Sequence, residues 1–403
     1  MKKSLIAMLC LSVFVLSATV SVFAQTTTLE GNLTTGCVTD YDPTVDYFPA
    51  KTTLTDAENF TVSYFNNYKV VTVAEAYDGA PSYDYVLLQC GTPAPDAADF
   101  PEGTQFLAVP ARTVIAMSTT QLPHLTQLDL LDRLVGVDTG LYINTPEVVA
   151  LVEAGTLVEI GGGTEVNIEL ALDTDPDLIL SYGYNPDFDA FPVLIDAGIF
   201  TSLNADYREA TPLSRAEWIK FTALFFNVEA TAETVYADIA ASYNEAAALA
   251  ATVPADARPT VLWNSFSSYD TAWSIPGALT YPARLIQDAG GVIALGDQAP
   301  DVSVKLTFEA VYAEALDAAV WLPNLFAVST LADIEAVDSR YVDFAAFATR
   351  QVWNDNLSEN ANGGNNYYEL GVTNPDLVLR DLVAIFHPEL LPDHAFVFFR
   401  RLG

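Results

Sequence analysis

The side chains of this sequence best suited to binding chemistry are hydroxyl, aromatic and amide groups that follow short apolar segments. In the first half of the chain they are Thr119, Thr120, Tyr142, Tyr182 and Tyr184. In the second half they are Trp263, Phe266, Tyr269, Trp273 and Asn324. Such groups hold a large, partly apolar ligand by stacking and hydrogen bonding. Each ring could equally belong to a hydrophobic core.

Motifs that would indicate catalysis are scarce. The three histidines, His124, His387 and His394, are too far apart in the sequence to indicate a metal site. The sequence contains no GxSxG elbow and no HExxH helix, and the Gly161-Gly162-Gly163 run predicts a turn rather than a phosphate loop. With 52 acidic residues, any two carboxylates could be taken as an acid and a base. A secreted hydrolase that uses paired carboxylates therefore stays an alternative.

The composition is strongly acidic. The 403 residues include 17 basic and 52 acidic ones, a net charge of −35, and 51% are hydrophobic. Such a chain has material for folded cores, and its charge opposes binding to nucleic acid. An anionic ligand would need the few cations to gather at its site. The candidates for that role are Arg112, Arg208, Arg215, Lys305 and Arg350.

The first residues predict an exported protein. Lys2 and Lys3 precede an uncharged apolar run, and Val22-Phe23-Ala24 supplies the small residues that signal peptidase requires. We therefore expect residues 1–24 to be a signal peptide that is cleaved near Ala24, which places the protein in a periplasmic or extracellular compartment. A retained membrane anchor is the weaker interpretation.

The two cysteines after the leader, Cys37 and Cys90, favour the same compartment, because an oxidising environment would allow them to pair. Strand-like residues 60–73 and 85–89 lie between them, with a Gly-Ala-Pro-Ser turn at 79–82. Residues 25–104 are therefore expected to form an N-terminal arm and β-hairpin, tied together by a disulfide. Two free thiols are the alternative.

The rest of the chain alternates apolar strands with helices. This pattern extends over residues 105–213 and begins again over residues 254–403, which predicts two α/β lobes with mainly parallel sheets. Ligands of such sheets bind beyond the carboxyl ends of the strands. The polar and aromatic side chains named first lie at these ends.

Residues 214–253 predict a long helix between the two lobes. Ser214 and Glu217 have the spacing of a capping box, and ten alanines lie between Ala230 and Ala251. After a break near Asn227 the helix continues to Pro254. We interpret it as a rigid spacer, the alternative being an ordinary surface helix within one large domain.

In this order and spacing, several short segments resemble the substrate-binding proteins of bacterial ABC importers of the iron–siderophore and cobalamin type. The resemblance covers residues from about Asp46 to the end of the chain. The segments are Val109-Pro110-Ala111-Arg112-Thr113-Val114, Leu131 to Val137, Asn167-Ile168-Glu169 with Pro176 to Leu180, and Ala210 to Glu229. Residues 365–370 and 375–390 are similar to one branch of this family.

The resemblance implies two lobes joined by one long helix, a ligand cleft between them and little hinge closure. It also implies that one glutamate on each lobe pairs with arginines of a membrane permease, and the matching positions are Glu169 and Glu309. A helix N-terminus that prefers negative charge is the alternative explanation for both residues.

The leading functional hypothesis is thus a non-enzymatic, monomeric binding protein that captures an iron–siderophore-like chelate and delivers it to an ABC permease. Cobalamin or haem is the alternative ligand in the same role, and no resident cofactor or metal is expected. The scarcity of cations departs from what an anionic ferric siderophore requires. A surface structural or adhesion protein remains a third possibility.

Overall fold

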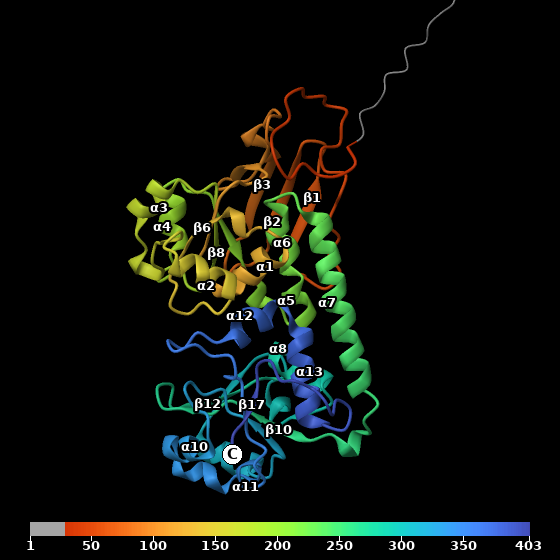
Figure 1. Ribbon diagram of the computed structural model, residues 1–403, viewed down its shortest axis with the longest axis vertical. Helices are drawn as coiled ribbons and strands as arrows, with labels where there is room; N and C mark the ends of the chain where they lie inside the picture. Colours follow the sequence, from red (N-terminus) through yellow and green to blue (C-terminus); the bar gives the residue numbers. More distant parts are fainter. Residues whose placement is uncertain (1–28) are drawn as a thin grey trace, which may run out of the picture.

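The computed structural model describes residues 29–403, which form two lobes stacked along the long axis of the molecule (Figure 1). The upper lobe in this view is called the N-lobe here, and the lower one the C-lobe. The predicted signal peptide lies outside the described residues. Among residues 29–403, no helix is both long enough and apolar enough to cross a membrane.

A five-stranded parallel sheet forms the centre of the N-lobe, in the order β7-β6-β5-β8-β9. Its strands carry apolar side chains toward both faces: Val114 and Ala116 join one buried cluster, and Ile115 and Met117 join another. Burial on both faces explains the continuous apolar runs in the sequence. The strands are β5 (Val114–Ala116), β6 (Leu134–Val137), β7 (Val158–Glu159), β8 (Leu178–Tyr182) and β9 (Thr201–Asn204).

Helices connect these strands, as the alternation predicted. Proline occupies the first turn of three of them, where the backbone N–H groups have no partner within the helix, so the missing N–H of proline costs no hydrogen bond. The helices are α1 (Leu122–Gln127), α2 (Pro146–Glu153), α3 (Ile168–Thr174) and α4 (Phe191–Asp196).

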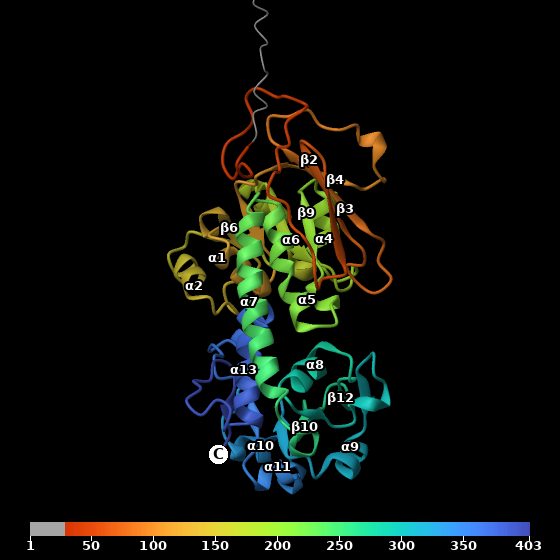
Figure 2. The same ribbon diagram turned by 90° about the vertical axis from the view of Figure 1, so that its right-hand side faces the viewer.

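A second sheet, of four strands, covers the N-lobe at its outer end (Figure 2). Its first three strands are antiparallel, and β4 pairs with β3 in parallel. The sequence placed residues 106–109 at the start of the α/β lobe, but they belong to this sheet, because an apolar alternation does not specify which strand it pairs with. The strands are β1 (Phe60–Tyr64), β2 (Tyr68–Val73), β3 (Tyr83–Gln89) and β4 (Gln105–Val109).

Cys37 and Cys90 form a disulfide at the end of β3. Beside it, the Val38 N–H donates to the Cys90 carbonyl oxygen at 2.9 Å. The bridge therefore attaches the N-terminal arm to the sheet, in the place where the sequence suggested it.

The segment before the long helix forms two short helices, α5 (Pro212–Ala216) and α6 (Trp218–Leu224), rather than the first part of a spacer. The capping box lies one turn earlier than predicted, between Thr211 and Ser214, because Pro212 occupies the first helical position. Every residue of α6 is buried in the N-lobe. The chain then turns at Asn227, which has a φ of +59°.

Helix α7 (Glu229–Ala250) is the connection between the lobes, shown in green along one side of the molecule in Figure 1 and facing the viewer in Figure 2. Its 22 residues span about 33 Å at a rise of about 1.5 Å per residue. Ala232, Tyr236 and Ile239 belong to the main hydrophobic core of the N-lobe. Tyr243, Ala246 and Ala250 belong to a core of the C-lobe. One helix thus contributes to the cores of both lobes.

The C-lobe contains a small parallel sheet in the order β13-β10-β15 and an antiparallel sheet in the order β11-β12-β14. The antiparallel sheet was not predicted, because its strands are only two to four residues long. Strands β16 and β17 form a separate pair. The strands are β10 (Thr260–Trp263), β11 (Phe266–Ser267), β12 (Ala272–Ile275), β13 (Val292–Ile293), β14 (Val304–Leu306), β15 (Val320–Leu322), β16 (Trp353–Asn354) and β17 (Arg400–Arg401).

Helices surround these C-lobe sheets, and α13 packs along the second half of α7. The helices are α8 (Tyr281–Asp288), α9 (Phe308–Ala315), α10 (Leu331–Val337), α11 (Ala345–Ala348), α12 (Asn366–Thr373) and α13 (Pro375–Phe386).

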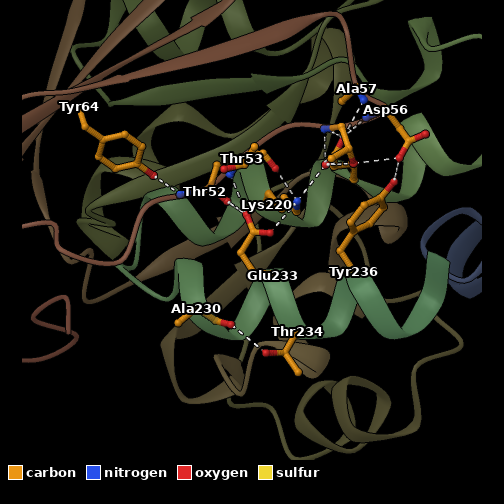
Figure 3. A network of polar contacts seen from close by, with 12 residues as sticks. Thr52, Thr53, Asp56, Ala57, Tyr64, Lys220, Ala230, Glu233, Thr234 and Tyr236 are labelled. Atoms are coloured by element: carbon orange, nitrogen blue, oxygen red, sulfur yellow. Dashed lines mark hydrogen bonds and ion pairs between the residues drawn. The ribbon is translucent and has the colours of Figure 1, made fainter. Parts of the chain in front are cut away.

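Carboxylates on α7 and just before α6 hold the N-terminal arm (Figure 3). Glu217 accepts hydrogen bonds from the backbone N–H groups of Asp56 and Ala57, both at 2.7 Å. Lys220 pairs with Glu217 and with Glu233, each at 2.9 Å. Glu217 and Lys220 are buried. The arm is therefore fixed to the helices by charge-assisted bonds, which are stronger than neutral ones.

A second buried ion pair joins β2 to the start of α7. The Lys69 ammonium bonds to the Glu229 carboxylate and, at 3.0 Å, to Asn227 Oδ1. Both charged side chains are fully buried. Burial lowers the pKa of Lys69, and the charge of Glu229 opposes that shift.

The lobes also touch directly, beside the long helix. Glu369 on α12 of the C-lobe is buried and accepts from the Asn144 and Thr145 N–H groups of the N-lobe, both at 2.7 Å. Thr145 caps α2 without a side-chain bond to the helix, so Glu369 of the opposite lobe supplies the negative charge there. At Gly364 an added Cβ would lie 2.1 Å from the Tyr142 carbonyl oxygen, so only glycine allows this approach.

We predict that Glu229→Gln lowers the free energy of unfolding by about 3 kcal/mol, because it leaves the Lys69 charge buried without a counter-charge. Urea unfolding measures the change. Glu245→Gln is the matched control on the same helix: Glu245 pairs with Arg380 at the surface, so its loss is worth less than about 1 kcal/mol. Equal losses in the two variants would contradict the assignment of Lys69 and Glu229 as a stabilising buried pair.

We predict that Glu369→Gln loosens the contact between the lobes, because an amide cannot accept from both N–H groups as the carboxylate does. Hydrogen exchange of the Asn144 and Thr145 amides should become about tenfold faster, in line with a loss of about 1.4 kcal/mol. Glu147→Gln, an exposed change on α2, is the control. Unchanged exchange in the Glu369 variant would show that this contact does not hold the lobes together.

Candidate functional site

The carboxyl ends of the N-lobe strands surround a hollow of about 380 Å³. Strand β5 leads to Ser118 and Thr119, β6 to Asp138, β8 ends at Tyr182, and β9 ends at Asn204. Since β5 lies between β6 and β8, the chain reverses its direction across the sheet at this point, where open α/β sheets bind ligands. The lining residues are Met117, Ser118, Thr119, Thr120, Gln121, Asp138, Tyr142, Tyr182, Tyr184, Asn204, Asp206, Tyr207 and Arg215.

A second hollow, of about 280 Å³, adjoins the first on the side of the C-lobe. The two share Thr119 and Tyr142, so they form one cleft between the lobes. Its C-lobe wall comes from the segment after β15, the segment after β16 and the start of α12. The lining residues are Thr119, Tyr142, Asn324, Leu325, Phe326, Asp355, Glu359, Gly363, Gly364, Asn365 and Tyr368.

The structure brings together six of the ten residues that the sequence singled out for ligand binding. Thr119, Thr120, Tyr142, Tyr182 and Tyr184 line the N-lobe side of this cleft, and Asn324 lines the C-lobe side. Tyr142 and Tyr184 are 49% and 73% exposed, so these rings are not part of a core. They follow the strand ends, as the expectation for a parallel sheet requires.

The four aromatic residues at the end of β10 and after it do not line either hollow, contrary to the expectation from the sequence. Trp273 is fully buried and packs among Phe308, Trp321, Tyr341 and Phe344. Its strand, β12, pairs with β11 and β14, which directs the ring into the lobe.

Trp263 and Phe266 also face the interior of the C-lobe. Tyr269 is 96% exposed in the loop between β11 and β12. Aromatic residues after a strand give the same sequence pattern whether they turn inward or outward, so the sequence could not separate these cases.

Of the five candidate cations, only Arg215 reaches the cleft. Its guanidinium pairs with Asp206 at 3.0 Å and lies 4.6 Å from the centre of the Tyr281 ring on the opposite lobe. The remaining candidates lie elsewhere: Arg112 pairs with Asp177, Arg208 with Glu75, Lys305 with Asp270, and Arg350 is exposed in the C-lobe.

Two carboxyl groups of the cleft have raised pKa values. Burial raises the pKa of Asp138, on the N-lobe wall, to about 6. Burial also raises the pKa of Asp355, on the C-lobe wall, to about 7, and the nearby charge of Glu359 adds to that effect. Neither residue stands out in the sequence, because so many other acidic residues surround it. The position of Asp138 directly after a strand was the one available signal.

The glutamates matched to permease docking, Glu169 and Glu309, lie in corresponding places on the two lobes. Each is in the first turn of a helix, α3 and α9, and each helix has a separate N-cap, Asn167 or Thr307. Both carboxylates are exposed. The closest cation to Glu309 is Arg340, at 3.6 Å, which bonds more tightly to Asp338 at 2.6 Å.

The three histidines lie apart, each with its own partner. His124 bonds to Thr222 at 2.9 Å, and burial lowers its pKa to about 4. His387 lies 3.1 Å from the Gly290 carbonyl oxygen and His394 lies 2.6 Å from Asp381. Within residues 29–403, no three His, Cys, Asp or Glu side chains are grouped so that they could hold a metal ion.

Two curated proteins of Methanocaldococcus jannaschii, both described as uncharacterized lipoproteins, are similar to this chain in sequence. One is 24% identical over 337 residues, which cover 80% of this chain and 77% of the relative. The other is 22% identical over 388 residues, which cover 88% of this chain and 92% of the relative.

Solved structures share the fold. A periplasmic binding protein from Veillonella parvula has a TM-score of 0.54 at 15% identity, over 82% of this chain and 98% of its own. A periplasmic heme-binding protein from Pseudomonas aeruginosa has a TM-score of 0.53 at 16% identity, over 73% and 98%. A protein described as an Fe³⁺-hydroxamate transport system, from Saccharomonospora viridis, has a TM-score of 0.50 at 16% identity, over 69% and 94%.

The two-lobed fold that the sequence predicted is thus confirmed, with its mainly parallel N-lobe sheet and its long connecting helix. The sequence model described as "Periplasmic binding protein" matches residues 114–352, which is more than half of the chain and includes the N-lobe wall of the cleft and the part of the C-lobe wall that directly follows β15. The chain belongs to the periplasmic binding protein family.

Proposed function

We propose that this protein is the extracytoplasmic substrate-binding protein of an ABC importer, and that it captures a chelate of the iron–siderophore type and passes it to the membrane permease. One observation carries the proposal: the N-lobe strand ends and the C-lobe form a single cleft whose exposed rings, Tyr142 and Tyr184, belong to no core. The similarity to a heme-binding protein and to a hydroxamate transport protein supports this ligand class.

The shape of the cleft supports a compact ligand with aromatic or macrocyclic faces. Hollows of this volume are typical of small-molecule sites, and tyrosine combines an apolar ring with a hydroxyl that donates or accepts. Cobalamin and haem are the alternative ligands in the same role, because both present a flat conjugated ring system to such walls.

The lobes are held so that the cleft needs little closure. Helix α7 lies in both cores, and Glu369 joins the lobes beside the cleft. Tyr142 belongs to the segment that Glu369 fixes, so a wall of the cleft is positioned before ligand arrives. Such preorganisation reduces the ordering that binding requires.

Docking on the permease is assigned to Glu169 and Glu309. The N-caps of their helices are already made by Asn167 and Thr307, so neither carboxylate is needed as a cap, and the contact of Glu309 with Arg340 is longer than the Arg340–Asp338 pair. Both carboxylates can therefore pair with arginines of a partner. Export through the predicted leader would place the protein outside the cytoplasm, where it acts as a monomer.

A hydrolase is the second candidate, and the raised pKa values of Asp138 and Asp355 are the observation in its favour. The two residues line different hollows of the cleft. Incubation with chromogenic glycosides and esters distinguishes the two: a binding protein leaves them intact, and turnover that Asp138→Asn abolishes would establish the enzyme.

We predict that calorimetric titration with ferric hydroxamates, corrinoids and haem shows saturable binding of one class, and that Tyr184→Ala weakens it about tenfold through the loss of ring contact. Tyr269→Ala is the matched control, because that ring is exposed outside the cleft. Equal weakening in the two variants, or binding unaffected by Tyr184→Ala and Tyr142→Ala together, would contradict the location of the site. Tryptophan fluorescence is a poor measure here, since Trp263 and Trp273 are buried in the C-lobe.

We predict that the double change Glu169→Gln and Glu309→Gln leaves chelate affinity unaltered and slows uptake by the permease in vesicles about tenfold, because exposed charges chiefly accelerate and orient docking. Glu153→Gln with Glu335→Gln provides a control with the same loss of charge at other exposed helical positions. If uptake falls equally in both double variants, the loss of net charge alone explains the effect, and the docking assignment is refuted.

A further inference from the structure

Two buried oxygen atoms at the C-lobe wall of the cleft have no hydrogen-bond partner among the described residues. One is Asp355 Oδ2, on a side chain that is only 2% exposed, and the other is Asn324 Oδ1. Both residues line the same hollow. A buried polar atom without a partner is unfavourable, so two of them in one hollow indicate that a ligand completes their hydrogen bonding.

Neighbouring bonds fix the orientation of the Asn324 amide. Asn264 donates its Nδ2 to the Ser274 carbonyl oxygen at 2.8 Å, which can only accept. Asn264 Oδ1 therefore faces Asn324 and accepts from Asn324 Nδ2 at 2.8 Å. The remaining polar atom of the Asn324 side chain is therefore Oδ1, which can only accept a hydrogen bond. An ionised Asp355 is likewise only an acceptor, so both open positions call for a hydrogen-bond donor.

The charges around the whole cleft favour the same kind of ligand. Four carboxyl groups line its two hollows, those of Asp138, Asp206, Asp355 and Glu359. Among the basic residues of the described part, Arg215 alone lines either hollow, and Asp206 already neutralises it at 3.0 Å. A ligand with negative charge would meet uncompensated carboxylates at short range in a partly desolvated site.

We propose, as a refinement that rests on the function proposed above, that the cleft selects a chelate without net negative charge and directs a cationic or N–H donor group of that chelate to Asp355 and Asn324. A protonated amine supplies N–H donors of the kind that both open acceptors require. By the same argument, anionic ligands such as ferric catecholates, and haem with its free propionates, should bind less tightly than neutral or cationic chelates.

Protonation of Asp355 should tune this selection. The titratable groups near its carboxyl are Glu359, Tyr367 and Tyr368, and the hydroxyl of Tyr368 lowers the pKa that burial raises. Above about pH 7 the carboxylate is charged and attracts a cationic ligand, whereas below that pH it is neutral. Affinity for a cationic chelate should therefore rise with pH through this range.

The test uses three ferric trihydroxamates that share one metal core: one with a free terminal amine, one with that amine acetylated and one with it succinylated. Their net charges are positive, neutral and negative. Calorimetry on the full mature protein should show affinity that falls about tenfold at each step from positive to negative. A corrinoid with water or cyanide as its axial ligand gives a second pair, in which the cationic aquo form should bind more tightly.

Variants test whether the named residues cause this order of affinities. Asp355→Asn should remove most of the preference for the amine and its rise with pH, and Asp138→Asn should reduce the preference without changing the pH profile near 7. Asp238→Asn, an exposed change on α7, removes the same charge far from the cleft and should leave the order intact. Thermal unfolding checks that the variants are folded, and Asp355→Asn should not be less stable, because it removes a buried charge that has no counter-charge.

Equal affinity for the three chelates, or tightest binding of the succinylated one, overturns the charge proposal and leaves the transport function standing. A preference that survives Asp355→Asn and Asp138→Asn together also overturns it. If neither the trihydroxamates nor the corrinoids bind at all, the chelate-binding function fails and this refinement fails with it.

Discussion

The burial of one helix in two hydrophobic cores is the constraint on which the rest of the structure depends. Ala232, Tyr236 and Ile239 of α7 pack into the N-lobe, and Tyr243, Ala246 and Ala250, farther along the same helix, pack into the C-lobe. Because a helix is stiff over this length, the two lobes cannot rotate freely about it. The contact of Glu369 with Asn144 and Thr145 adds a second attachment, so the space between the lobes has a defined width before any ligand binds.

Within this fixed geometry, the two lobes contribute different chemical groups to the cleft. The N-lobe contributes hydroxyl groups and rings from its strand ends, and the C-lobe contributes acceptors in Asn324 and Asp355. The excess of acidic residues elsewhere also has structural uses, since Glu217, Glu229 and Glu233 bind the arm or a buried lysine. In the cleft, by contrast, carboxylates that lack a neighbouring cation favour ligands without net negative charge.

The sequence predicted those features that follow from local pattern. The alternation of strands and helices located the N-lobe sheet, and the rule for strand ends located Thr119, Tyr142 and Tyr182. The sequence did not predict features that depend on contacts between residues far apart in the chain. Strand β4 pairs with β3 in the four-stranded sheet rather than with the parallel sheet. Trp273 faces a core of the C-lobe because β11 and β14 flank its strand. Asp355 escaped notice because its importance comes from burial and a missing partner, which no spacing reveals.

The location of the ligand can be decided by a crystal structure of the complex, phased with the anomalous signal of the chelated metal. We expect one metal position between the lobes, close to the shared wall of Thr119 and Tyr142, with a donor group of the chelate next to Asp355 and with α7 unbent. A metal bound outside the cleft, or lobes that rotate about α7 to enclose it, would refute the proposed site and its fixed geometry.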